Sequence, residues 1–379
     1  MKIIIIGTAF PLRGGIAHFN ALLSKYLSKQ HDVETITFKR QYPKILFPGK
    51  TQEENFQMEG IQPAPQMIDS INPYNWFKVA YKIREKRPDL LIFKYWLPFF
   101  GPCFGTIARR VKKNSGTKVL FICDNVIPHE KRPGDILFTK FAFKYVDYFI
   151  VQSKSVEKEL LNIVPNANYS FSPHPLYEYF GKPLEKKNAR ENLRIKEEKV
   201  ILFFGYIRPY KGLSVLIDAM KILKDYESQM GKVNLLAVGE AYEDISTYKD
   251  KIQKYGLSSN IQIISDYIPN HLVATYFSAA DVVVLPYLSA TQSGIVQIAY
   301  NFDKPVIATD VGGLSEVVLN GFTGFIVSPG KPGELAEAIR KFYYEEKEIF
   351  FSENVKKEKN KYTWDHFVNA IEMLVKKIK

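Results

Sequence analysis

The chain has 379 residues, 46% hydrophobic and 24% charged, which are globular proportions that exclude a disordered or fibrous protein. Its longest apolar runs are only as long as a strand, far short of the ~18–20 residues that span a bilayer, so we expect no transmembrane anchor. The formal net charge of +12 points to an anionic partner such as nucleic acid, a membrane surface or a phosphorylated small molecule.

The positive charge is concentrated in the first half of the chain. Residues 1–180 hold 25 basic and 15 acidic side chains, a net charge of +10, whereas residues 181–379 have a net charge of only +2. A basic half that meets an anionic partner and a lysine-rich surface that meets only water both fit this pattern.

Cysteine content and the first residues predict a cytoplasmic protein. Cys103 and Cys123 lack the spacing of a metal or redox site, as expected of thiols in a reducing compartment. The apolar run Ile3–Ile6 is too short for the core of a signal peptide, and it is interpreted as the first buried strand.

Short apolar runs alternate with longer amphipathic stretches in the first half of the chain. This pattern predicts strands at 2–7, 33–38, 89–94, 117–122, 147–151 and 169–172. Between them it predicts helices at 15–29, 73–86, 99–113, 135–144 and 153–162. Residues 41–65, rich in Pro, Lys and Gln, are expected to form a long loop.

The alternation stops at residues 172–199, a proline-containing and charged stretch that predicts a linker, and it resumes at Val200. The second half predicts strands at 199–204, 232–238, 260–264, 281–285, 305–308 and 324–327. Its predicted helices lie at 212–224, 245–255, 270–278, 293–301 and 332–343.

The predicted architecture is α/β, with two doubly wound, Rossmann-like domains at 1–180 and 195–360. Ligands of open parallel sheets bind at the carboxyl ends of the strands, so a cleft between the two domains is the expected site. Four loops that connect a strand to a helix carry residues suited to chemistry.

The first loop, Arg13–Ile16, contains Gly14 and Gly15 just before a helix. Paired glycines allow a ligand to approach the backbone, and a helix start offers free N–H groups to an anion. A turn that serves only close packing is the alternative.

The second loop, Cys123–Glu130, contains Asp124, Asn125, His129 and Glu130 after a predicted strand. Polar groups at the carboxyl end of a strand are typical of functional loops on this scaffold. Ordinary turn chemistry before Pro128 is the alternative.

The third loop, Phe204–Gly212, places Arg208 and Lys211 at or just before the start of a helix. Its Gly205 can turn the chain sharply and, like Gly239, is a candidate donor-binding residue. Cations at a helix start oppose the helix dipole, so they suit a bound anion better than they suit helix stability. A diphosphate meets the requirement, because arginine grips two oxygens and lysine supplies a point charge. Two solvated cations are the alternative.

The fourth loop, Leu285–Gly294, offers Thr291 as a helix N-cap and the N–H groups of Gln292, Ser293 and Gly294 to a second anionic oxygen. Gly239 and the stretch 310–316 follow neighbouring strands and complete a ring of loops.

Metal, ATP and nucleic-acid chemistry find little support. The sequence has no Asp-x-Asp pair and no histidine spacing typical of a metal site. It also lacks a Walker-type loop and a basic pattern typical of nucleic-acid recognition.

The chain resembles glycosyltransferase family 4, retaining enzymes of the GT-B fold. The resemblance extends over essentially the whole chain and rests on the strings FFGYIRPYKGLSVLIDAM, DYIPNHLVATYFSAADVVVLPY and TQSGIVQIAYNFDKPVIATDVGGLSEVVLNGFTGFIV, with RGGIA and DNVIPHE before them. It implies transfer of a sugar from a nucleotide-sugar, UDP-sugar favoured over GDP-sugar, without metal or cofactor.

The resemblance implies roles for individual residues. Lys211 would bind the diphosphate, and Gly14 and Gly15 would approach the donor phosphates and sugar. The loop that contains Tyr267 and Ile268 would lie beside the base, and helix 363–379 would cross back onto the first domain.

Four positions depart from the family pattern. Tyr206 replaces the arginine that usually follows the glycine, so Arg208 is the candidate substitute. Ala290 and Ile298 stand where the family commonly carries two glutamates. Asp124 stands in place of a histidine, whose role passes to Asp124 or to His129.

The resemblance implies a hexosyltransferase for a glycan or lipid-linked acceptor, which we expect to act in cell-surface polysaccharide synthesis. The aromatic stretch 94–100 and the basic cluster 109–113 predict peripheral docking on an anionic membrane, at its inner face. Burial of Trp96, Phe99 and Phe100 in the core is the alternative. A non-catalytic scaffold subunit and a sugar-nucleotide epimerase of the same fold remain open.

Overall fold

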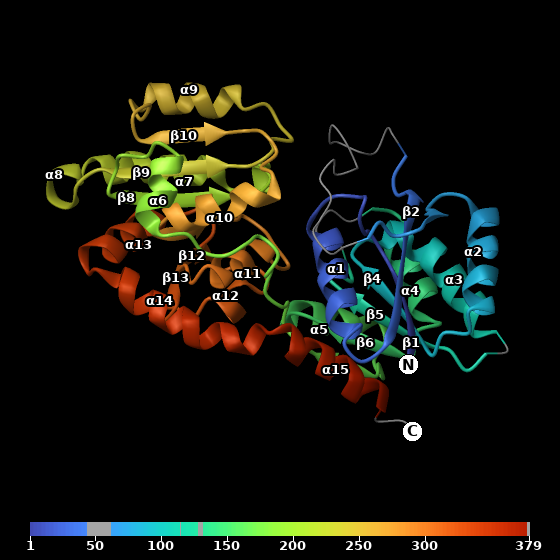
Figure 1. The fold of residues 1–379 in the computed structure, drawn as a ribbon. Helices are drawn as coiled ribbons and strands as arrows, with labels where there is room; N and C mark the ends of the chain where they lie inside the picture. Colours follow the sequence, from blue (N-terminus) through green and yellow to red (C-terminus); the bar gives the residue numbers. More distant parts are fainter. Residues whose placement is uncertain (44–61, 114, 128–131, 377–379) are drawn as a thin grey trace. The chain divides into compact units, whose positions relative to one another are not determined.

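The computed structural model describes residues 1–43, 62–113, 115–127 and 132–376, which form two compact units. Unit 1 comprises Met1–Pro175 together with Thr363–Lys379, and unit 2 comprises Leu176–Tyr362 (Figure 1). Each unit is an α/β domain built on one parallel sheet.

Unit 1 contains a seven-stranded sheet in the order β3-β2-β1-β4-β5-β6-β7. The strand order switches between β1 and β4: earlier strands extend the sheet on one side of this point and later strands on the other. Its strands are β1 (Lys2–Ile6), β2 (Asp32–Arg40), β3 (Gln66–Asp69), β4 (Leu90–Tyr95), β5 (Lys118–Cys123), β6 (Tyr148–Val151) and β7 (Tyr169–Phe171). All neighbouring strands are parallel.

Helices cover this sheet. They are α1 (Gly15–Leu27), α2 (Pro73–Glu85), α3 (Gly101–Lys112), α4 (Asp135–Phe143), α5 (Lys154–Ile163) and α15 (Trp364–Lys376). Helices α2 to α5 bury apolar side chains in one core cluster with the strands, and α1 packs on α15. The central strands are buried on both faces, which explains why their sequences are continuous apolar runs.

Unit 2 contains a six-stranded parallel sheet in the order β10-β9-β8-β11-β12-β13, and its strand order switches between β8 and β11. Its strands are β8 (Lys199–Phe204), β9 (Val233–Val238), β10 (Ile261–Ile264), β11 (Val282–Leu285), β12 (Val306–Thr309) and β13 (Gly324–Val327). Its helices are α6 (Lys186–Asn192), α7 (Leu213–Lys224), α8 (Glu227–Met230), α9 (Ser246–Lys254), α10 (Asn270–Ala279), α11 (Gly294–Asn301), α12 (Leu314–Val317), α13 (Pro332–Tyr344) and α14 (Lys347–Glu358).

The predicted strands and long helices are confirmed to within a few residues, but the sequence pattern missed several elements. Strand β3 is a four-residue strand at the sheet edge, too short to show a period. Helix α6 lies in the stretch that was predicted to be a linker, and it packs on α10. Helix α14 lies beyond the last helix predicted in the second half. Most of the predicted loop 41–65 lies outside the described residues.

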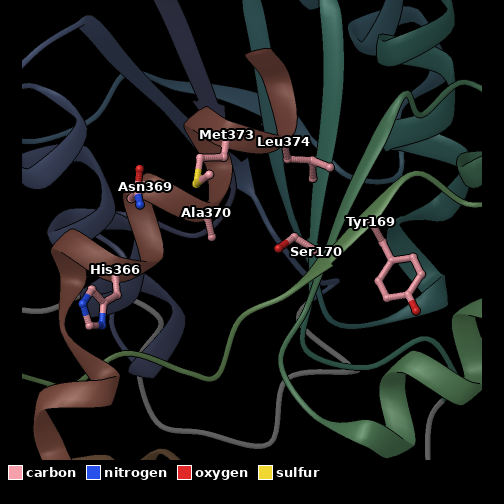
Figure 2. Close-up of a pocket in the computed structure, with 7 residues that line it drawn as sticks. All are labelled: Tyr169, Ser170, His366, Asn369, Ala370, Met373 and Leu374. Atoms are coloured by element: carbon pink, nitrogen blue, oxygen red, sulfur yellow. The ribbon is translucent and has the colours of Figure 1, made fainter. Parts of the chain in front are cut away.

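Helix α15 is part of unit 1. The rings of Phe19 and Tyr26 in α1 lie 5.1 and 5.7 Å from that of Trp364, and Lys29 forms an ion pair with Asp365 at 3.0 Å. A pocket of about 270 Å³ lies between α15 and β7. Figure 2 shows the Ser170 side chain directed toward α15 and the Tyr169 ring pointing away from it.

None of the residues predicted for the site lines this pocket. No helix of the described residues combines the length and the apolar character needed to cross a membrane.

Candidate functional site

The loops at the carboxyl edge of the unit 2 sheet are joined to one another by backbone hydrogen bonds. The Ile207 N–H donates to the Glu240 carbonyl at 3.0 Å, which links the loops after β8 and β9. The Leu288 N–H donates to the Tyr210 carbonyl at 2.8 Å, which links the loops after β8 and β11. These loops therefore form one rim on both sides of the point where the strand order switches, between β8 and β11. Open α/β sheets bind ligands at such a switch point.

Glycines make this rim compact. A Cβ on Gly212 would collide with the Pro286 carbonyl, and a Cβ on Gly239 would collide with the Gly205 carbonyl. Gly205 and Gly212 also have φ angles of +112° and +72°, which favour glycine. The positive φ thus explains Gly205 and close packing explains Gly239, and their predicted role in donor binding stays a prediction.

Substitution of Gly212 by alanine is expected to destabilise unit 2 by more than ~2 kcal/mol, because strain at positive φ adds to the collision. Gly321 is the matched control, since its φ is +75° and its Cβ would meet nothing within 4 Å. Gly321→Ala should therefore cost only ~1–2 kcal/mol. Equal losses in denaturant unfolding would show that the Pro286 contact is unimportant.

Arg208 and Lys211 rest on aromatic rings rather than on carboxylates. Lys211 ends the short 3₁₀ turn Pro209–Lys211 that precedes α7, and its Nζ lies 3.7 Å from the centroid of the Tyr287 ring. The Arg208 guanidinium lies 4.7 Å from the centroid of the Tyr242 ring. Cation–π contacts hold a cation in place without neutralising its charge.

Within the part of the chain that the structure describes, neither cation forms an ion pair, and Arg208 Nε is buried without a hydrogen-bond partner. The amide Nε2 of Gln292, in the loop before α11, is also buried without one. Buried donors without partners cost free energy unless a ligand satisfies them. Burial lowers the pKa of Lys211 to about 8, and the nearby Arg208 adds to this lowering.

Ser293, and not Thr291, is the N-cap of α11. The Ser293 Oγ accepts a hydrogen bond from the Ile295 N–H at 3.3 Å and also lies 3.1 Å from the Tyr287 hydroxyl. The helix therefore starts at Gly294, later than predicted. Gly294 lies against the Tyr177 ring, where a Cβ would lie 2.8 Å from the nearest ring carbon.

Apolar residues fill the positions of the missing glutamates. Ala290 and Ile298 are both buried, and the Ala290 carbonyl lies where a Cβ on Gly312 would be. Tyr267 and Ile268 follow β10 at the same edge of the sheet, Tyr267 being exposed and Ile268 half-buried.

In unit 1, Gly14 is the N-cap of α1 and Gly15 its first residue. Gly14 has a φ of +114°, and a Cβ there would meet nothing within 4 Å. Its backbone conformation, rather than packing, therefore favours glycine.

Asp124, directly after β5, is paired with a lysine that the sequence analysis did not consider for the site. Lys94 Nζ on β4 lies 2.5 Å from Asp124 Oδ1, donates to Gln152 Oε1 at 3.3 Å, and lies 3.5 Å from the centroid of the Phe19 ring. The Lys94 side chain is only 1% exposed and that of Asp124 is 23% exposed. His129 lies outside the described residues.

The prediction that residues 94–100 form a membrane-docking surface is wrong for most of this stretch. Tyr95, Trp96 and Phe100 are buried, and Phe99 is half-buried. Trp96 and Phe100 pack on Phe38 and Phe104 in the core beneath α3. The aromatic residues are core because the strand end and the following helix enclose them.

Comparisons with known proteins agree with this fold. Residues 185–363, a little under half of the chain, match the family model described as glycosyl transferases group 1. An uncharacterised glycosyltransferase of Methanocaldococcus jannaschii is 29% identical over 98% of this chain and 97% of its own length. A D-inositol 3-phosphate glycosyltransferase of Corynebacterium glutamicum is 30% identical over 42% of this chain. The matched segment spans only 38% of the length of that relative.

A lipopolysaccharide 1,2-N-acetylglucosaminetransferase of Salmonella typhimurium is 27% identical over 60% of this chain and 61% of its own length. Among solved structures, the Anabaena protein HepE in complex with UDP superposes over all of both chains, with a TM-score of 0.79 and 17% identity. Sucrose-phosphate synthase from Thermosynechococcus elongatus has a TM-score of 0.72 and 19% identity, over 98% of this chain and 97% of its own. The chain has the GT-B fold, and the sequence matches support a glycosyltransferase.

Proposed function

We propose that the chain is a retaining glycosyltransferase of family 4 that transfers a hexose from a nucleotide-diphosphate sugar. The observation that carries this proposal is the pair of cations at the start of α7. Arg208 and Lys211 lie in the loop after β8 with no carboxylate partner among the described residues. The unpartnered amide nitrogen of Gln292 belongs to the loop after β11, which is hydrogen-bonded to the first loop. An anion with several oxygens, such as a diphosphate, satisfies all three groups.

The donor is expected to bind unit 2 with its diphosphate on Arg208 and Lys211. Arginine grips two phosphate oxygens, lysine supplies a point charge, and the N–H groups at the start of α11 face a further oxygen. Tyr267 and Ile268 then lie beside the base. We favour UDP-sugars over GDP-sugars, and the UDP complex of the structural neighbour HepE supports that order.

In this mechanism the two cations stabilise the diphosphate as the glycosidic bond to it breaks. The acceptor hydroxyl attacks the same face of the sugar, and its proton passes to an oxygen of the departing phosphate. One bond from the sugar to oxygen forms as another breaks, and one proton moves from the acceptor to the phosphate. This step therefore needs no protein base, metal ion or cofactor. Charged groups placed where charge develops are the largest contribution to catalysis in such sites.

For the acceptor we propose a glycan or lipid-linked molecule of cell-surface polysaccharide synthesis, at the cytoplasmic side of the cell membrane. The name of one relative, the lipopolysaccharide 1,2-N-acetylglucosaminetransferase, supports an acceptor of this kind.

A second candidate is a non-catalytic subunit that binds a nucleotide-sugar. Buried apolar side chains at Ala290 and Ile298, where the family commonly carries glutamates, favour it. Binding without turnover would distinguish this candidate from the enzyme.

A thermal-shift screen over UDP-, GDP- and ADP-sugars tests the proposal. A ligand at 100 times its Kd adds ~2.7 kcal/mol to the stability of the folded protein, so a UDP-sugar should raise Tm measurably. Donor hydrolysis or transfer by the purified protein would then establish the enzyme. Failure of every nucleotide-sugar to shift Tm would contradict the proposal.

A further inference from the structure

Helix α2 presents an aromatic row to solvent. Tyr74, Phe77 and Tyr81 are spaced at i, i+3 and i+7 and are exposed to 79%, 43% and 55%. Val79, Ala80 and Ile83 of the same helix are buried against the sheet. The helix thus has one apolar face in the core and a second, aromatic face that is largely exposed to solvent.

Helix α4 adds a second apolar group to the same layer of helices. Ile136, Leu137 and Phe138 begin this helix, and all three are exposed. Helix α3 lies between α2 and α4 and packs on both (Figure 1). The contact with α4 is close, since a Cβ on Gly101 at the start of α3 would collide with the Phe138 carbonyl.

The charge of these three helices is strongly positive. They contain two acidic residues, Glu85 and Asp135, and seven basic residues, Lys78, Lys82, Arg84, Arg109, Arg110, Lys112 and Lys140. Only Lys112 of these basic residues is in an ion pair within the described structure, with Asp147. The Arg110 guanidinium lies 4.6 Å from the centroid of the exposed Phe77 ring. Cations and exposed aromatics therefore share one surface.

We propose that the exposed face of α2, α3 and α4 docks on an anionic lipid bilayer. Basic side chains are attracted to anionic headgroups, and aromatic rings insert at the headgroup level. A protein partner suits this face less well, because the buried core of a protein interface is depleted of charge. A bilayer accepts aromatics among lysines, because their stems lie along the apolar surface while the ammonium groups stay at the headgroups.

The docking face keeps basic residues of the predicted cluster 109–113, and it replaces the largely buried aromatic stretch 94–100 with exposed side chains of α2 and α4. It does not depend on the proposed donor site, because every residue in it belongs to unit 1 and none is assigned to catalysis. Unit 2 offers a comparison: Tyr344, Ile349 and Phe350 are also exposed there, but three glutamates at 345, 346 and 348 lie among them.

Co-sedimentation with vesicles tests the inference with the full chain. The protein is expected to bind vesicles made of equal parts of phosphatidylcholine and phosphatidylglycerol, and to bind pure phosphatidylcholine much more weakly. Lys78→Gln/Lys82→Gln should weaken binding to the anionic vesicles by about fivefold for each lysine, and added salt should remove this difference. Tyr74→Ser/Phe77→Ser/Tyr81→Ser should weaken binding to both.

The matched control is Tyr344→Ser/Ile349→Ser, which removes comparably exposed apolar side chains from unit 2 and should leave binding unchanged. All the substituted side chains are exposed, so circular dichroism and Tm should match those of the unmodified protein. Equal binding to neutral and anionic vesicles, or full binding by the α2 variants, would overturn the proposal. Self-association that the α2 variants abolish, without vesicle binding, would instead assign the face to a second copy of the chain.

Discussion

Substitution of Lys211 by alanine is expected to lower the turnover of donor by about 10²–10³-fold, the usual loss when one placed donor is removed from a developing anion. Lys211 is held by the Tyr287 ring at 3.7 Å and has no carboxylate partner among the described residues, so its charge is available to a phosphate. The measurement is release of UDP from a UDP-sugar at saturating donor. The control is Lys249→Ala, since Lys249 is an exposed lysine of α9 in the same unit.

The low pKa of Lys211 gives this prediction a pH dependence. With a pKa of about 8 in the free protein, the side chain loses its proton as the pH rises above 8. An anion binds the protonated form, so affinity for a UDP-sugar should be constant near pH 7 and fall above pH 8. In Lys211→Arg the charge persists, because arginine does not titrate in this range, and the fall should disappear. A fall of the same size in Lys211→Arg would assign the titration to another group.

Substitution of Asp124 by asparagine is expected to destabilise unit 1 by ~3–5 kcal/mol at neutral pH, because it leaves the charge of Lys94 buried without a partner. Lys94 is 1% exposed, and its remaining contacts are the Gln152 amide and the Phe19 ring. His174 adds no second positive charge beside Lys94, because burial and the proximity of Lys94 lower its pKa to about 3. Urea unfolding of the variant and of the unmodified protein measures the loss.

The sign of the pH dependence follows from the burial of Lys94. Burial already lowers the pKa of Lys94 despite Asp124, and loss of the carboxylate lowers it further. The folded variant then binds fewer protons at Lys94 than its unfolded chain does, so its stability rises with pH below the ordinary lysine pKa. The deficit of Asp124→Asn should therefore shrink as the pH is raised from 7 toward 10.

The double substitution Lys94→Met/Asp124→Asn is the control. It removes both charges, and an uncharged pair of similar volume is often as stable as a buried ion pair. The double variant should recover most of the lost stability and be insensitive to pH at this position. A single variant as stable as the unmodified protein at pH 7 would show that Lys94 is not charged in the folded state.

Much of the fold could be predicted because parallel strands buried on both faces must be continuous apolar runs, as in Ile3–Ile6 and Val282–Leu285. Arg208 and Lys211 stood out because cations oppose a helix start. Strand β3 and helix α6 were missed because a four-residue strand and a charged seven-residue helix have too few residues to show a period.

The parts of the site that escaped prediction depend on contacts between distant residues. Tyr287 lies 76 positions beyond Lys211 in the chain, so nothing in the local sequence indicates that its ring contacts the Lys211 ammonium group. Lys94 was grouped with its aromatic neighbours, and only the pairing of β4 with β5 places it beside Asp124. The N-cap of α11 was misplaced because Thr291 and Ser293 can each cap a helix, and it is the Ser293 hydroxyl that accepts from the Ile295 N–H and lies beside the Tyr287 hydroxyl.

Calorimetric titration of UDP into the unmodified protein and into Arg208→Ala/Lys211→Ala at pH 7 tests the central claim most directly. Each charged hydrogen bond contributes ~1.5–3 kcal/mol, so loss of both cations should raise the Kd for UDP by at least about a hundredfold. Binding of UDP with the same Kd by both proteins, each shown to be folded, would contradict the assignment of the diphosphate to these two residues.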